Sequence, residues 1–207
     1  MRILAAILLA LVLAVPAKAA MTDPANPMGD VAAVEAYLSG IKTLKAKFVQ
    51  TDNEGKRIGG TFLLKRPGRM SFTYDPPVKD FIVADGTFIN YYDAEMKQGS
   101  RTLISKSLAD FFLREKLTLS GDLQVSTVKR EGGMLLLTLV EKKEPNAGSM
   151  VLAFTEVPSL ELRKWRIVDP GGSVTEVELF NTQTGVKLDN DLFHYYDPER
   201  SKGKLNK

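Results

Sequence analysis

Few residues of this sequence have the chemistry of a catalytic or metal site. The chain has one histidine, His194, and no cysteine, which leaves too few ligands for a zinc site. His194 stands beside two tyrosines, a setting that favours an ordinary strand residue over a general base. Asp75, Asp80, Asp85 and Asp93 each stand where a turn favours aspartate. Because nucleophile elbows, phosphate loops and dinucleotide fingerprints are also missing, the sequence predicts no enzyme, no metal site and no cofactor.

Two strands joined by a tight turn are predicted between residues 59 and 74. Pro67 fixes its own φ and Gly68 tolerates a positive φ, which together favour a turn. Side chains alternate between the two faces of a strand, so Met70 and Phe72 share one face of the second strand. This hairpin therefore has an apolar face.

Arg66 has the most unusual setting among the charged residues. On the first strand of the hairpin it shares a face with Phe62 and Leu64, whereas Lys65 faces the other way. A guanidinium at the end of an apolar row is costly to bury unless it meets hydrogen-bond acceptors. Arg66 is therefore either a surface arginine that extends to water or a cation held at the edge of an apolar surface.

The elements that must position these residues are mostly strands. Alternating patterns predict roughly eleven of them, near residues 44–48, 59–66, 69–74, 79–84, 87–93, 98–103, 122–129, 134–141, 149–157, 161–168 and 173–182. Two helices are expected, at 30–40 and 107–116, from apolar residues at helical spacing. Asp30 suits the first N-cap and Gly40 the end of that helix.

Short connections make nearly all neighbouring strands antiparallel. Such a sheet must bury an apolar face, and eleven strands in one small domain curl rather than stay flat. We therefore expect a mainly β fold: an unclosed antiparallel barrel, or half-barrel, covered by the two short helices as a lid. Residues 20–207 are expected to form this single domain.

The first residues predict export. Arg2 is followed by an almost wholly apolar run, and Ala17-Lys18-Ala19 has the small residues of a cleavage site. Residues 1–19 are therefore predicted to be a signal peptide, and the mature chain to be a soluble periplasmic protein. Its removal takes away Arg2 and Lys18 and lowers the formal net charge from +3 to +1, which gives no support to nucleic-acid binding.

Apolar side chains are more numerous than a small barrel needs. Methionine and phenylalanine suit a surface that takes up disordered acyl chains, because methionine repacks easily. The predicted lipid-binding cavity consists of Phe62, Leu64, Met70, Phe72, Phe81, Val83, Leu108, Phe111 and Phe112.

The ordered motifs of the chain resemble those of the periplasmic outer-membrane lipoprotein carrier family, LolA. They are Phe48-Val49-Gln50, Gly60-Thr61-Phe62, Lys65-Arg66-Pro67-Gly68-x-Met70-x-Phe72, Asp85-Gly86, Tyr92-Asp93, Gln98 and Phe111-Phe112-Leu113. The resemblance covers essentially the whole predicted mature chain. It implies an unclosed barrel of eleven strands with a helical lid, in agreement with the strand pattern.

The resemblance also implies a function. The family binds the acyl chains of lipoproteins that an inner-membrane ABC transporter releases, and delivers them to the outer membrane, to an acceptor where one exists. Arg66 matches the arginine that latches the family's lid through backbone carbonyls. Met70 and Phe72 stand where the family often has an aromatic residue and a tryptophan, so the fit of the ligand is expected to differ. A monomer is expected.

A second function is also compatible with the sequence. Related half-barrels occur in periplasmic regulators that sense lipids or lipoproteins, although those usually carry a second domain. The outer-membrane acceptor shares the fold as well, but it is lipid-anchored through a cysteine that this sequence lacks.

Overall fold

The computed structural model describes residues 27–107, 110–146 and 148–202. The predicted signal peptide, residues 1–19, lies outside this described part of the chain. Within it, none of the helices combines the length and apolar character that crossing a membrane requires.

Eleven strands form one antiparallel sheet. They are β1 (Thr43–Thr51), β2 (Arg57–Lys65), β3 (Arg69–Tyr74), β4 (Phe81–Asp85), β5 (Phe88–Asp93), β6 (Gln98–Leu103), β7 (Leu123–Glu131), β8 (Met134–Glu141), β9 (Ser149–Thr155), β10 (Glu161–Val168) and β11 (Val174–Thr184). Each predicted strand is present, and differences are confined to strand ends.

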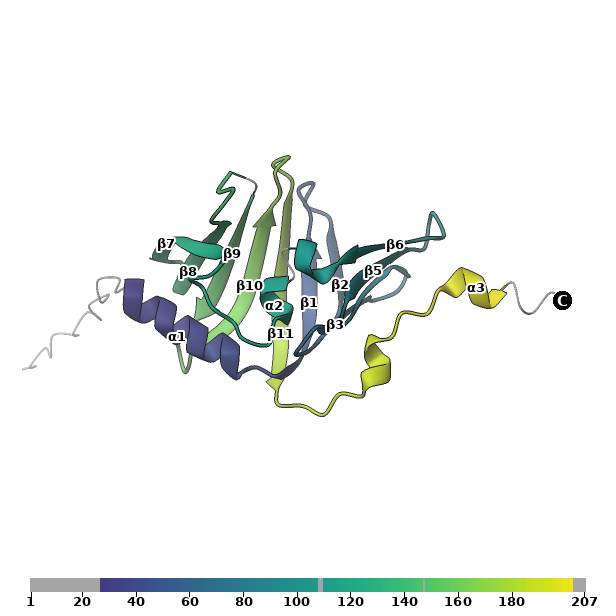
Figure 1. Cartoon of the computed structure of the whole chain (residues 1–207), viewed down its shortest axis with the longest axis horizontal. Helices are drawn as coiled ribbons and strands as arrows, with labels where there is room; N and C mark the ends of the chain where they lie inside the picture. Colours follow the sequence, from purple (N-terminus) through teal and green to yellow (C-terminus); the bar gives the residue numbers. More distant parts are fainter. Residues whose placement is uncertain (1–26, 108–109, 147, 203–207) are drawn as a thin grey trace, which may run out of the picture.

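The order of strands leaves the sheet open. It runs β6-β5-β4-β3-β2-β1-β11-β10-β9-β8-β7, so the first and last strands of the chain pair near the centre. In that pair Leu44 lies opposite Thr184 and Thr51 opposite Glu176. Within the described residues no ladder joins the edge strands β6 and β7, and the sheet curves without closing (Figure 1). The predicted unclosed antiparallel fold is confirmed.

The core lies on one face of this sheet, which we call the inner face. Alternation explains it: in β1, Leu44, Ala46 and Phe48 are buried, whereas Lys45 and Lys47 are exposed. The same face continues across both halves of the sheet through Phe62, Leu64, Met70, Phe72, Leu137, Leu139, Leu152, Phe154, Leu162, Trp165, Val177 and Leu179.

Short helical segments cover the inner face (Figure 1). Helix α1 (Pro27–Gly40) buries Val34 and Leu38, which are one turn apart. Between β6 and β7 lie the 3₁₀ helix η1 (Ile104–Lys106) and the single-turn helix α2 (Asp110–Leu113). The sequence predicted α1 with a later start. It was wrong on the end of the second helix, which was predicted to reach residue 116 and ends at Leu113.

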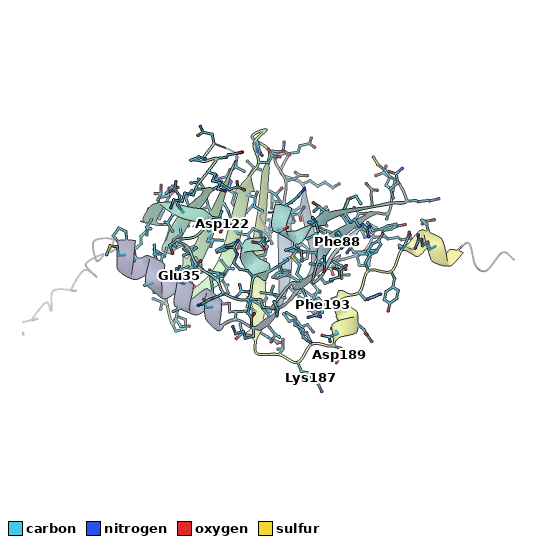
Figure 2. All side chains as sticks on the ribbon, in the orientation of Figure 1. Glu35, Phe88, Asp122, Lys187, Asp189 and Phe193 are labelled. Atoms are coloured by element: carbon cyan, nitrogen blue, oxygen red, sulfur yellow. The ribbon has the colours of Figure 1, made fainter. Side chains whose placement is uncertain are left out.

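A C-terminal segment covers part of the opposite, outer face. It contains the 3₁₀ helix η2 (Asn190–Phe193) and helix α3 (Pro198–Lys202). Lys65 Nζ donates to the Leu188 carbonyl at 2.7 Å and to Asn190 Oδ1 at 2.8 Å. Phe193, labelled in Figure 2, is buried beneath this segment. This covering could not be predicted from the sequence, because its apolar residues are too irregularly spaced to show a period.

Candidate lipid-binding site and its lid

Arg66 is buried directly after β2, with 8% of its surface exposed. Its Nε donates to the carbonyl oxygen of Phe112, in α2, at 2.6 Å. Its Nη1 donates to the carbonyl of Leu38, in the last turn of α1, and to the carbonyl of Ile41 at 3.0 Å. One guanidinium therefore binds backbone atoms of both helices that cover the inner face.

The acceptors and the donor are chemically matched. The last carbonyls of a helix lack partners within it, and the single turn of α2 leaves the Phe112 carbonyl in the same position. Arginine has five N–H donors and no acceptor. Burial lowers the pKa of Arg66 to about 10, so the guanidinium keeps its proton at neutral pH and all its donors remain available.

The turn that follows Arg66 adds a further bond to α2. The amide of Gly68 donates to the Leu113 carbonyl at 2.8 Å. Gly68 has a φ of +78°, and a Cβ there would lie 2.8 Å from the Cα of Gly86. The turn was predicted from Pro67-Gly68, but its contact with α2 was not, because no local pattern reports an amide that binds across the sheet.

Other polar contacts tie α1 to the connection between α2 and β7. Glu35, labelled in Figure 2, accepts a hydrogen bond from the amide of Leu119 through its Oε1. Ser39 Oγ donates to the Leu117 carbonyl at 3.3 Å. The helix and this connection thus form one continuous covering, which we call the lid: α1, α2 and residues 114–119.

Arg114 fixes the end of the lid nearest to β7. It pairs with Asp110 at 2.5 Å and with Asp122, labelled in Figure 2, at 2.8 Å. The hydrogen bond from Arg114 lowers the pKa of Asp122 to about 2. Asp122 is therefore ionised throughout the physiological pH range, and this anchor is present whenever the lid is closed.

Aromatic rings form the floor beneath the lid. The rings of Phe62 and Phe72 lie 4.6 Å apart, and Phe62 meets Trp165 at 5.6 Å. From the lid, the ring of Phe112 packs on Trp165 at 5.2 Å. Phe112 is thus held twice, through its ring by the floor and through its carbonyl by Arg66.

Most of the predicted cavity residues lie together on the inner face or in the lid that covers it. Those in the buried core are Phe62, Leu64, Met70, Phe72 and Phe111, with Phe112 half-buried beside them. These side chains form one buried cluster between sheet and lid, so an apolar ligand needs the lid to move before it enters. Leu108 lies outside the described residues.

Two predicted cavity residues lie on the wrong face. In the β3–β4 ladder Phe81 pairs with Thr73 and Val83 with Ser71, which places both on the outer face. There the ring of Phe81 stacks on Tyr92 at 5.2 Å. The inner-face positions of β4 are instead Ile82 and Ala84. The break at Pro76-Pro77 interrupts the alternation, so the pattern before it could not fix the register of the strand after it.

Two of the four aspartates named above, Asp85 and Asp93, stabilise turns, whereas Asp75 pairs with Lys47 at 3.4 Å and Asp80 accepts a hydrogen bond from the Ala94 amide at 2.9 Å. Asp85 accepts hydrogen bonds from the amides of Thr87 and Phe88 at 2.9 and 2.8 Å. Asp93 accepts one from the Met96 amide at 2.7 Å. No cluster of three potential metal-ligating side chains is found among the described residues. What the inner face can do chemically is bind apolar groups.

Comparison with known proteins gives the family. The model of the family "Outer membrane lipoprotein carrier protein LolA" matches residues 39–196. The outer-membrane lipoprotein carrier protein of Methylococcus capsulatus is 27% identical over 173 residues, which is 80% of this chain and 82% of that protein. The protein of the same name from Legionella pneumophila is 29% identical over 175 residues, 80% and 85% of the two chains.

One solved structure aligns more loosely. The LolA superfamily protein NE2245 of Nitrosomonas europaea gives a TM-score of 0.42 at 11% identity, over 80% of this chain and 97% of that one. The family model covers most of the described residues, including Arg66, both strands of its hairpin and α2. This chain therefore belongs to the outer membrane lipoprotein carrier protein family, LolA.

Proposed function

We propose that this protein is a periplasmic carrier that holds the acyl chains of lipoproteins between its inner face and its lid. It takes them from an inner-membrane transporter that releases lipoproteins and delivers them to the outer membrane, to an acceptor where one exists. The observation that carries the proposal is the buried Arg66, whose donors bind carbonyls of both lid helices over an apolar face.

The proposal explains why a cation occupies the edge of the core. An acyl chain gains about 0.8 kcal/mol for each methylene that it buries, so a carrier that simply enclosed its cargo would not release it. When the cavity is empty, the lid gains the hydrogen bonds of Arg66. Those bonds compete with the cargo, because a chain can enter only after they break.

Binding of a fatty acid tests the proposal. Trp165, the only tryptophan, lies on the floor of the site, so its fluorescence reports a brominated fatty acid that enters. We expect quenching in the wild type and none in Leu64→Asp or Met70→Asp, which place a carboxylate on the inner face. Thr73→Asp, on the exposed outer side of β3, is the control and should retain quenching.

Circular dichroism separates loss of binding from loss of fold. Quenching that persists in both folded inner-face variants contradicts the proposed site. Absence of quenching in the wild type contradicts the proposed function itself.

A further inference from the structure

A second apolar feature lies outside the floor of the lipid site, between α1 and strand β7. It is a groove of about 460 Å³, lined from α1 by Met28, Val31 and Ala32 and from β7 by Val125 and Val128. That volume falls within the roughly 300–1,000 Å³ typical of sites for small ligands.

A β-bulge gives the groove its apolar wall. Val125 and Val128 are three residues apart and would face opposite sides of a regular strand. The register shifts between Val125 and Thr127, so that Val125 lies opposite Leu139 and Val128 opposite Leu137. Both leucines belong to the inner face. The bulge therefore turns both valines toward α1 at the edge of the sheet.

The groove connects the core with solvent. Val31, Val125 and Val128 are half-buried and pack against the inner-face core. At the outer end, Met28 is 84% exposed. Apolar side chains thus line the groove from the edge of the core to the surface.

Of the three polar side chains that line the groove, those of Glu35, Ser126 and Thr127, the first two are already bonded within the protein. Glu35 Oε1 accepts a hydrogen bond from the Leu119 amide, and Ser126 Oγ donates to the Thr138 carbonyl at 3.3 Å. A polar ligand would have to break these bonds, whereas a hydrocarbon chain would leave them intact. The lining therefore favours a hydrocarbon ligand.

An ion-pair cluster holds α1 to the sheet beside the groove. Arg130 of β7 donates to both carboxylate oxygens of Asp30, in the first turns of α1, at 2.8 and 3.1 Å. It also donates to both oxygens of Glu156 at 2.8 and 3.0 Å. These bonds keep the N-terminal part of α1 at a set distance from β7, while Arg66 holds the other end of the helix.

We propose that this groove binds one acyl chain of the cargo as it passes between solvent and the inner face. The proposal rests on the proposed carrier function and adds to it the place of entry. A lipoprotein keeps its polar protein part in water, so at least one of its chains must cross the surface of the carrier. The groove borders the core, and apolar side chains line both its α1 wall and its β7 wall.

Tryptophan reporters test the place of entry separately from the carrier function. The first reporter is the native Trp165. The second adds Met28→Trp to the native chain, which puts an indole at the outer end of the groove, and is read as the quenching beyond that of Trp165 alone. The third, Tyr196→Trp added and read in the same way, is the control, because Tyr196 is 68% exposed on the other side of the sheet. Each protein is titrated with the brominated fatty acid used above.

The three reporters distinguish the outcomes. We expect quenching at Trp165 and at the added indole of Met28→Trp over the same concentration range, and none at the added indole of Tyr196→Trp. Quenching at Trp165 without quenching at Met28→Trp overturns the groove and leaves the carrier function intact. Equal quenching at all three reporters is non-specific adsorption and also overturns the groove. Quenching at none contradicts the carrier function.

A charge on the groove wall gives a second measurement. Ala32 lines the groove, whereas the next residue, Ala33, is exposed and does not line it. Ala32→Glu should weaken the fatty-acid affinity measured at Met28→Trp by about tenfold or more, and Ala33→Glu should leave it unchanged. Both positions are exposed on a helix, so both variants are expected to fold. Equal affinities in the two variants contradict the groove.

Discussion

Lys65 and Arg66 are neighbours in the chain, yet they donate hydrogen bonds on opposite sides of the sheet. Lys65 binds the Leu188 carbonyl of the C-terminal segment, and Arg66 binds the carbonyls of the lid. The end of β2 therefore holds both coverings of the molecule. Because the two side chains face apart, each covering can be released by a substitution that leaves the other in place.

The Arg66→Leu variant should bind lipoprotein readily and transfer it poorly. Hydrogen bonds from a charged donor contribute about 1.5–3 kcal/mol each, and the substitution removes those that close the empty lid while adding apolar surface. We expect a larger fraction of Arg66→Leu than of wild type to be isolated with lipoprotein bound, and slower transfer to acceptor membranes. Arg66→Lys should be intermediate, because an ammonium lacks the planar fork.

Lys65→Leu is the matched control for the lid. It should loosen the C-terminal segment, seen as faster proteolysis after residue 186, and keep wild-type loading and transfer. Wild-type loading and transfer in Arg66→Leu would show that the guanidinium does not latch the lid.

Gly68→Ala should destabilise the contact between the hairpin turn and α2. The φ of +78° disfavours a Cβ, and the added atom would lie 2.8 Å from Gly86. We expect a loss of about 1–3 kcal/mol in the free energy of unfolding, measured by urea denaturation. Gly132→Ala is the control, since Gly132 also has a positive φ, +59°, but open space around it. Equal losses of unfolding free energy in Gly68→Ala and Gly132→Ala would mean that the contact of the added Cβ with Gly86 does not destabilise the protein.

Gly60→Ala should disturb the floor of the lipid site. A Cβ at Gly60 would lie 2.6 Å from the ring of Phe48 and 2.3 Å from the Thr73 carbonyl. Overpacking of this kind costs about 1–3 kcal/mol. At the adjacent Gly59 the nearest atom is an exposed carboxylate oxygen at 3.3 Å, so Gly59→Ala should cost less. Thermal unfolding of both variants measures the difference, and a reversed order would contradict the packing described here.

Stability should fall at high pH through a partly buried tyrosine, Tyr74. Burial raises the pKa of Tyr74 to about 12, and its hydroxyl donates to Gln50 Oε1 at 2.9 Å. Because the unfolded chain releases this proton at about pH 10, the contribution of Tyr74 to stability is present below pH 10 and is lost as the pH rises through 12. Tyr74→Phe should therefore lose less stability between pH 10 and 12 than the wild type does.

Urea denaturation across that range measures the effect. Tyr196→Phe, which removes an exposed phenol, should follow the wild type. A Tyr74→Phe curve parallel to that of the wild type would contradict the assignment to Tyr74.

The strands could be predicted from the sequence because the alternation of apolar and polar residues is a local property. The alternation of Leu44, Ala46 and Phe48 with lysines predicts a buried face, whichever element covers that face. The same reasoning set Arg66 apart, since it combined a charge with an apolar row. The identity of its partners needed the structure: the Leu38 and Phe112 carbonyls are backbone atoms, and any residue type supplies them.

Where the alternation is interrupted, the prediction was wrong. The face of Phe81 and Val83 depends on the register across Pro76-Pro77, which only pairing with β3 determines. The pair of Arg130 and Asp30 left no sequence signal either, because the two residues are far apart in the chain and each alone is an ordinary charged residue.

The pairing of β1 with β11 has a consequence for how the protein folds. Strands β1–β6 and β7–β11 are two runs in which each strand pairs with its neighbour in sequence, and the β1–β11 ladder is what joins them within one sheet. Pairings between distant segments form slowly, because a long loop must close first. Until that happens each run exposes its row of leucines and phenylalanines, and such surfaces aggregate. We propose that the folded protein shields the acyl chains of lipoproteins from water. While it folds, it must also keep its own apolar face from aggregating.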